Sequence, residues 1–304
     1  MSRQQQADLD AMLRQAPLDD SADVPTLRAG FEEVMRRTPV AGDVRKTPTT
    51  VGGIEALEVT IDGTDSANVI LYFHGGGYLI GSAQASGPLA ADIARRTGAK
   101  VVSVDYRLAP ENPYPAAVED AKAAYEGLLS QGVDPAQIAI AGESAGAGLA
   151  AATLLALRDT DARLPSSAFL MSPMADLTFS GDTIVDKQVV DPLLTAEWLR
   201  RGASYYVAGG DAADPYVSPA LGDLAGLPPL LIQVGSHEIL LSDAIRLAGR
   251  AATADVAVTL EVVPCVPHVF QAYAAMLDEA DAALDRAATF LETKFAATQP
   301  TPAA

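Results

Sequence analysis

Short apolar runs recur along the chain, and most are followed by a segment with helical periodicity. Continuous apolar runs of this length are typical of strands covered on both faces, as in a parallel sheet. They fall at residues 68–73, 100–106, 137–141, 166–171, 230–234 and 258–263. Helical patterns fall at residues 85–96, 116–129, 145–157, 242–252 and 279–296. The alternation predicts an α/β fold with a largely parallel sheet covered by helices, to which residues 57–62 could add an antiparallel edge strand.

Two segments do not fit this alternation. Residues 1–45 are helix-prone and precede the first predicted strand, and residues 177–210 interrupt the pattern with amphipathic content. We interpret both as a helical cap, because a structureless loop of that length is rare in a compact domain. The alternative is an N-terminal arm with a long surface loop. The catalytic domain would then comprise residues 46–176 and 211–297, and residues 298–304 would form a flexible tail.

The strongest chemical signal is the pentapeptide Gly142-Glu143-Ser144-Ala145-Gly146, which matches the G-x-S-x-G nucleophile elbow. It follows a predicted strand and opens a helix rich in alanine and leucine, which is the setting the elbow requires. Glycine on each side permits a tight turn that lifts the Ser144 hydroxyl above the sheet. The helix N-terminus there favours a developing anion. We therefore predict Ser144 as a nucleophile rather than a simple helix cap.

A second motif, His74-Gly75-Gly76-Gly77, follows the apolar strand ending at Phe73. A phosphate-binding loop would need a Lys-Ser/Thr ending or wider glycine spacing, and neither is present. Ester hydrolysis passes through a negatively charged tetrahedral intermediate, which backbone N–H groups stabilise. We assign the N–H groups of Gly76, Gly77 and Ala145 to an oxyanion hole, and we expect His74 to have a structural role.

The general base is chosen among the three histidines by their order along the chain. In enzymes with this elbow the triad members follow in the order Ser, Asp or Glu, His. His74 precedes Ser144, and His237 lies just after the strand at 230–234. His268 follows the last predicted strand and precedes the C-terminal helix, and we predict it as the base.

The third member should then lie in the loop after residues 230–234, where Glu238 and Asp243 are the candidates. Glu238 stands four residues after the strand. Asp243 falls early in the next predicted helix, where a carboxylate is favoured for another reason. We predict that Glu238 orients His268, and we keep Asp243 as the alternative.

Composition limits the partners and cofactors. The 304 residues carry a formal net charge of −18 without any Lys/Arg-rich run, so nucleic acid and anionic membrane surfaces are not expected partners. The single cysteine, Cys265, excludes an internal disulfide, and its apolar neighbours predict a small buried side chain. The scattered histidines form no zinc-like pattern, and we expect no metal and no organic cofactor.

The ends of the chain and its apolar stretches bear on location. The N-terminus is polar and lacks the apolar core of a secretory signal. The longest nearly apolar stretch, residues 145–157, is too short to span a bilayer. We therefore expect a cytoplasmic protein without a membrane partner.

A set of motifs spread over residues 45–295 carries a family resemblance. The motifs are His74-Gly75-Gly76-Gly77-Tyr78, Asp105-Tyr106-Arg107-Leu108-Ala109-Pro110-Glu111, Pro115-Ala116-Ala117, the Ser144 pentapeptide, Ser172-Pro173, Val217-Ser218-Pro219 and the region of His268. Together they resemble the bacterial hormone-sensitive lipase-like esterases, family IV of the α/β-hydrolase superfamily. That resemblance implies an α/β-hydrolase fold with an eight-stranded, mostly parallel sheet and a helical cap. It also implies a structural role for Tyr106 and Arg107, and it is compatible with a homodimer. The family usually has Asp where this chain has Glu238.

These observations predict a carboxylesterase whose substrates are small-molecule esters with short to medium acyl chains. Hydrolysis would pass through an acyl-enzyme on Ser144. A lactone, amide or lipid hydrolase would need the same triad. A non-catalytic binding protein on this scaffold would be expected to lack a triad residue.

Overall fold

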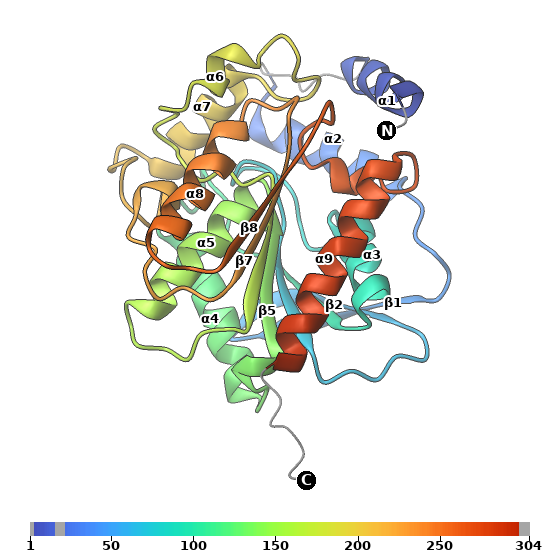
Figure 1. The fold of residues 1–304 in the computed structure, drawn as a ribbon, viewed down its shortest axis with the longest axis vertical. Coiled ribbons are helices and arrows are strands. Elements are labelled where there is room, and N and C mark those ends of the chain that lie inside the picture. The colour runs from blue at the N-terminus through green and yellow to red at the C-terminus, as the bar shows by residue number, and fades with distance from the viewer. Residues whose placement is uncertain (1–2, 16–21, 298–304) are drawn as a thin grey trace.

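A computed structural model describes residues 3–15 and 22–297. Its centre is one eight-stranded sheet in the order β1-β2-β4-β3-β5-β6-β7-β8, with helices on both faces (Figure 1). The strands are β1 (Val44–Val51), β2 (Ile54–Ile61), β3 (Val69–Phe73), β4 (Lys100–Val104), β5 (Ile138–Glu143), β6 (Ser167–Met171), β7 (Leu230–Gly235) and β8 (Val258–Val263). Strands β3 to β8 run parallel, whereas β1 and β2 form an antiparallel hairpin and β2 is antiparallel to β4. The predicted fold class is confirmed.

Helices cover both faces of the sheet because the strands alternate apolar side chains between the two sides. On one face, Ile70 and Tyr72 of β3 pack in a core with residues of α3 and α9, and on the other Leu71 and Phe73 pack with residues of α4, α5 and α8. The covering helices are α3 (Gly87–Thr97), α9 (Asp278–Ala297), α4 (Ala116–Ser130), α5 (Ala145–Arg158) and α8 (Leu241–Thr253). This burial holds the carboxyl ends of the strands in fixed positions.

Where the structure describes them, the two segments that interrupt the alternation contain four helices. They are α1 (Arg3–Arg14), α2 (Val24–Arg36), α6 (Thr183–Asp186) and α7 (Ala196–Val207), all near the upper end of the sheet in Figure 1. Residues 298–304, predicted to be a flexible tail, lie outside the described residues.

Two expectations about the rest of the chain were incomplete or wrong. Strand β1 was not predicted, because most of its residues are polar and it contains no apolar run. It forms the edge of the sheet, where residues 57–62 were expected to lie. Cys265 was expected to be buried, but it is exposed. Its apolar neighbour Val262 belongs to the half-exposed edge strand β8, and Cys265 itself occupies the following turn with a φ of 61°.

Candidate active site

Ser144 occupies a strained turn between β5 and α5. Its φ of 56° and ψ of −121° lie in a region that side chains other than glycine rarely adopt. The flanking glycines make the turn sterically feasible. A Cβ atom on Gly142 would lie 2.4 Å from the carbonyl oxygen of Gly146, and one on Gly146 would lie 2.0 Å from that of Phe73. The elbow therefore requires glycine at both positions.

The triple-glycine loop and Ser144 line one cavity. Gly75, Gly76 and Gly77 line this cavity together with Ser144 and His268. Gly76 and Gly77 have φ values of 112° and 62°. Within residues 3–15 and 22–297, the N–H groups of Gly76, Gly77 and Ala145 donate to no protein acceptor. Three unsatisfied N–H groups at such a site can bind an oxyanion.

His74 anchors the start of this loop. Its buried ring stacks on Tyr106 with centroids 4.3 Å apart, and its Nδ1 lies 2.8 Å from the carbonyl oxygen of Gly75. The Tyr106 hydroxyl donates to the His74 carbonyl oxygen at 2.7 Å. Burial lowers the pKa of His74 to about 4, so the ring is neutral at pH 7. These contacts fit the structural role expected for His74 and Tyr106.

His268 and Glu238 form a buried pair. His268 Nδ1 lies 2.7 Å from Glu238 Oε2, and both side chains are almost fully inaccessible to solvent. Glu238 Oε1 accepts hydrogen bonds from the Ser172 hydroxyl at 2.9 Å and the Gly235 N–H at 2.6 Å. These donors fix the carboxylate, and the carboxylate directs His268 Nε2 away from itself. His268 and Ser144 both line the same cavity.

The alternative site residues lie elsewhere. Asp243 Oδ2 accepts hydrogen bonds from the N–H groups of Ala175 and Asp176, each at 2.9 Å, and so fastens the segment after β6. Burial raises the pKa of Asp243 to about 7. His237 is half-buried and does not line the cavity. The structure thus pairs His268 with Glu238 rather than with Asp243.

Glu143 is a site residue that the sequence reasoning missed. Its side chain lines the cavity, and its carboxylate accepts a hydrogen bond from Gly75 N–H at 2.8 Å and another from the Tyr72 hydroxyl. Burial raises the pKa of Glu143 to about 7. It occupies a variable position of the elbow motif, so only its ionisable character in a buried strand could have singled it out.

The remaining walls of the cavity, about 180 Å³ in volume, are largely apolar. They come from α2, from the segment around α7 and from the loop after His268, through Phe31, Met35, Leu193, Leu194, Trp198, Leu199 and Tyr273. Sequence patterns did not identify these residues as a cavity wall, because they come from three separate segments and none belongs to a motif.

The described part of the chain offers neither a metal site nor a membrane-spanning helix. It contains no group of three or more His, Cys, Asp or Glu side chains that could hold a metal ion. None of the helices in residues 3–15 and 22–297 combines the length and apolar character needed to cross a membrane.

Several known proteins are similar in sequence to this chain. A family model for the α/β hydrolase fold matches residues 70–272. An acetyl-hydrolase from Streptomyces hygroscopicus is 47% identical over 224 residues, which are 74% of this chain and 75% of that protein. An esterase from Acinetobacter venetianus is 38% identical over 265 residues, 87% of each chain.

Solved structures give the same assignment. The crystal structure of EstE5 has a TM-score of 0.93 and 38% identity, over 97% of this chain and 100% of that one. An esterase from the bacterial hormone-sensitive lipase family has a TM-score of 0.93 and 37% identity, over 97% and 99% of the two chains. The chain therefore belongs to the α/β-hydrolase family and, within it, to the bacterial hormone-sensitive lipase family. It is a serine ester hydrolase, which confirms the family and enzyme class predicted from the sequence.

Proposed function

We propose that the protein is a carboxylesterase for short- to medium-chain esters, with Ser144 as nucleophile, His268 as general base and Glu238 as the orienting acid. The observation that carries the proposal is the 2.7 Å contact between His268 Nδ1 and Glu238 Oε2. His268 lines the same cavity as Ser144. A buried carboxylate on Nδ1 selects the tautomer whose Nε2 can accept a proton.

In the first half of the reaction, His268 Nε2 takes the Ser144 proton while Oγ attacks the ester carbonyl carbon. The carbonyl oxygen becomes an anion that accepts hydrogen bonds from the N–H groups of Gly76, Gly77 and Ala145. The tetrahedral intermediate collapses as His268 returns the proton to the departing alcohol. The acyl group remains on Ser144.

In the second half, a water molecule gives a proton to His268 and attacks the acyl carbon. Collapse of this intermediate returns the proton to Ser144 Oγ and releases the acid. Every proton transfer uses His268, and Glu238 stabilises the imidazolium that forms twice.

The preference for short and medium acyl groups follows from the cavity. Its volume of about 180 Å³ is below the roughly 300–1,000 Å³ of pockets for drug-sized ligands. We further propose that α1, α2, α6 and α7 form a cap, since α2 and α7 contribute Met35 and Trp198 to the cavity wall. The acetyl-hydrolase among its relatives supports a small acyl group.

The test is Ser144→Ala, assayed with p-nitrophenyl acetate, butyrate and palmitate and with a lactone. We expect the wild type to favour acetate and butyrate, and the variant to lose all turnover while keeping its circular dichroism spectrum. Turnover retained by the folded variant would contradict the nucleophile. A wild type that prefers palmitate or the lactone would contradict the substrate class.

A further inference from the structure

A second cavity, about 380 Å³ in volume, lies beside the one that contains Ser144. Three of its lining residues are cationic and one is acidic, although the whole chain carries a net charge of −18. The cations are Arg36, Arg37 and Lys46, and the carboxylate is Glu32. The Glu32 carboxylate already accepts a hydrogen bond from Ser82 Oγ at 2.6 Å. This concentration of positive charge sets the cavity apart from the acidic chain that surrounds it.

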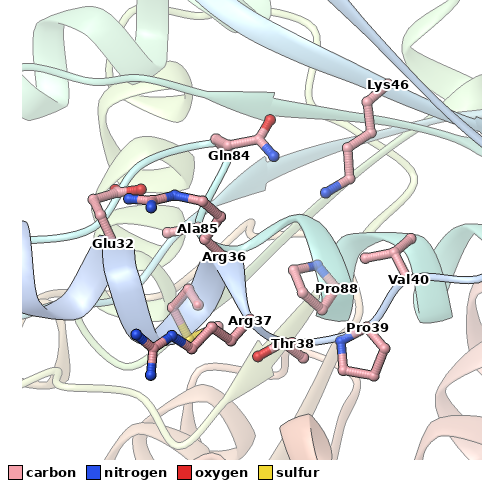
Figure 2. Close-up of a pocket in the computed structure, with 11 residues that line it drawn as sticks. Glu32, Arg36, Arg37, Thr38, Pro39, Val40, Lys46, Gln84, Ala85 and Pro88 are labelled. Atoms are coloured by element: carbon pink, nitrogen blue, oxygen red, sulfur yellow. The ribbon is translucent and has the colours of Figure 1, made fainter.

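Lys46 is held in an electrostatically unfavourable position. Figure 2 shows its side chain reaching from β1 towards Gln84 and Pro88 at the start of α3. A Cβ atom on Gly87 would lie 2.4 Å from Nζ, so the ammonium sits directly against the first residue of that helix. The N-terminus of a helix carries a partial positive charge, and Ser86 makes no side-chain cap there.

The Lys46 ammonium also has no counterion among the residues that the structure describes. Within the described part of the chain, no carboxylate lies within salt-bridge distance of Lys46, whereas Lys100 pairs with Glu58 at 3.0 Å. Burial lowers the pKa of Lys46. A half-buried cation beside the positive end of a helix would be stabilised by an anion bound in the cavity that Lys46 lines.

The α2 side of the cavity adds a weaker field. Arg36 and Arg37 both pair with Glu33, so the three residues together carry one net positive charge. Both guanidinium groups are mostly exposed and screened by solvent. Lys46 is therefore the anchoring cation, and the arginines raise the local potential.

The cationic cavity and the active-site cavity share part of one wall. Met35 and Ala85 line both of them. A flexible methionine side chain and a methyl group are thus the shared boundary between the reacting ester and the cations.

We propose that this cavity is a carboxylate-binding subsite of the enzyme, with Lys46 as its principal ligand. The carboxylate could come from two sources. One is the free carboxyl end of a substrate that is a half-ester of a dicarboxylic acid, and the other is the acid that ester hydrolysis releases. The inference rests on the proposed esterase function, because that function places an acyl group on the other side of Met35.

The first experiment compares the ethyl half-esters of dicarboxylic acids of four to ten carbons with the ethyl esters of the matching half-amides. The amide is nearly isosteric with the carboxylate but uncharged. We expect the wild type to favour the half-ester about tenfold in kcat/KM at one chain length, and Lys46→Gln to reduce that ratio to about one. Lys122→Gln, which removes a half-buried cation on α4 that pairs with Glu126, should keep the wild-type ratio.

The second experiment titrates octanoate into the wild type and Lys46→Gln by calorimetry, which needs no turnover. If Lys46→Gln binds octanoate about tenfold more weakly than the wild type, and the wild type shows no preference for half-esters, the subsite binds the released acid. Equal octanoate binding by both proteins, with no charge selectivity in the wild type, would overturn the proposal. If the wild type does not hydrolyse the neutral esters, the proposed esterase function is contradicted. The calorimetric comparison of octanoate binding would still test the subsite.

Discussion

Glu143 Oε1 accepts a 2.8 Å hydrogen bond from the N–H of Gly75, which ties the residue before the nucleophile to the loop that carries the proposed oxyanion donors. The same carboxylate accepts a hydrogen bond from the Tyr72 hydroxyl. A Cβ atom on Gly75 would lie 3.2 Å from both Glu143 Cγ and Ser144 Cβ, so the two segments are packed closely. The elbow and the glycine loop therefore hold each other in position.

This relationship makes Glu143 a positioning residue that can be tested by substitution. Glu143→Leu leaves the buried Gly75 N–H without an acceptor, which should lower the free energy of unfolding by about 1–3 kcal/mol. The freed loop should also lower kcat on p-nitrophenyl butyrate by about tenfold. Glu143→Gln keeps an acceptor oxygen and should restore most of kcat. A Leu variant with wild-type kcat would show that the contact does not position the loop.

The same residue predicts a pH dependence of stability. Burial raises the pKa of Glu143 from 4.5 to about 7, so the folded protein binds this proton more tightly than the unfolded chain does. Its contribution to stability is complete below pH 4.5 and is lost as the pH rises through about 7. Urea unfolding at pH 5 and pH 8 should show a smaller loss of stability in Glu143→Gln than in the wild type. Glu126→Gln, at an exposed site on α4, is the control and should follow the wild type.

The choice between Glu238 and Asp243 yields a paired prediction. Glu238→Gln should lower kcat by about 10³–10⁴-fold, because the amide favours the wrong tautomer of His268 and cannot stabilise the imidazolium. Asp243→Asn should change kcat less than fivefold, roughly, since Asp243 bonds to backbone N–H groups and not to His268. Kinetics on p-nitrophenyl butyrate would measure both, with circular dichroism to confirm folding. The reverse ranking would assign the acid to Asp243.

The sequence predicted most of the fold because six of the eight strands carry apolar runs that are visible without a structure, and residues 57–62 indicated a seventh strand. Strand β1 was not predicted because it is an edge strand in contact with solvent. Exposed polar residues such as Arg45 and Thr47 alternate in it with partly buried ones. Glu238 and Asp243 follow the same strand, so chain order could not separate them, and only the contact with His268 does. The cavity wall could not be predicted, since Met35 and Trp198 are brought together by tertiary packing.

The elbow itself provides the sharpest test of the backbone geometry. Gly146→Ala would place a Cβ atom 2.0 Å from the Phe73 carbonyl oxygen, a group fixed in the central strand β3. We expect a loss of several kcal/mol in the free energy of unfolding, on the order of 3 or more, or failure to fold. Gly249→Ala is the matched control: it lies within α8, has nothing within 4 Å of a new Cβ atom, and should stabilise the protein by about 0.5–1 kcal/mol. Urea unfolding of both variants measures the difference, and a Gly146→Ala protein as stable as wild type would rule out the close approach of α5 to β3.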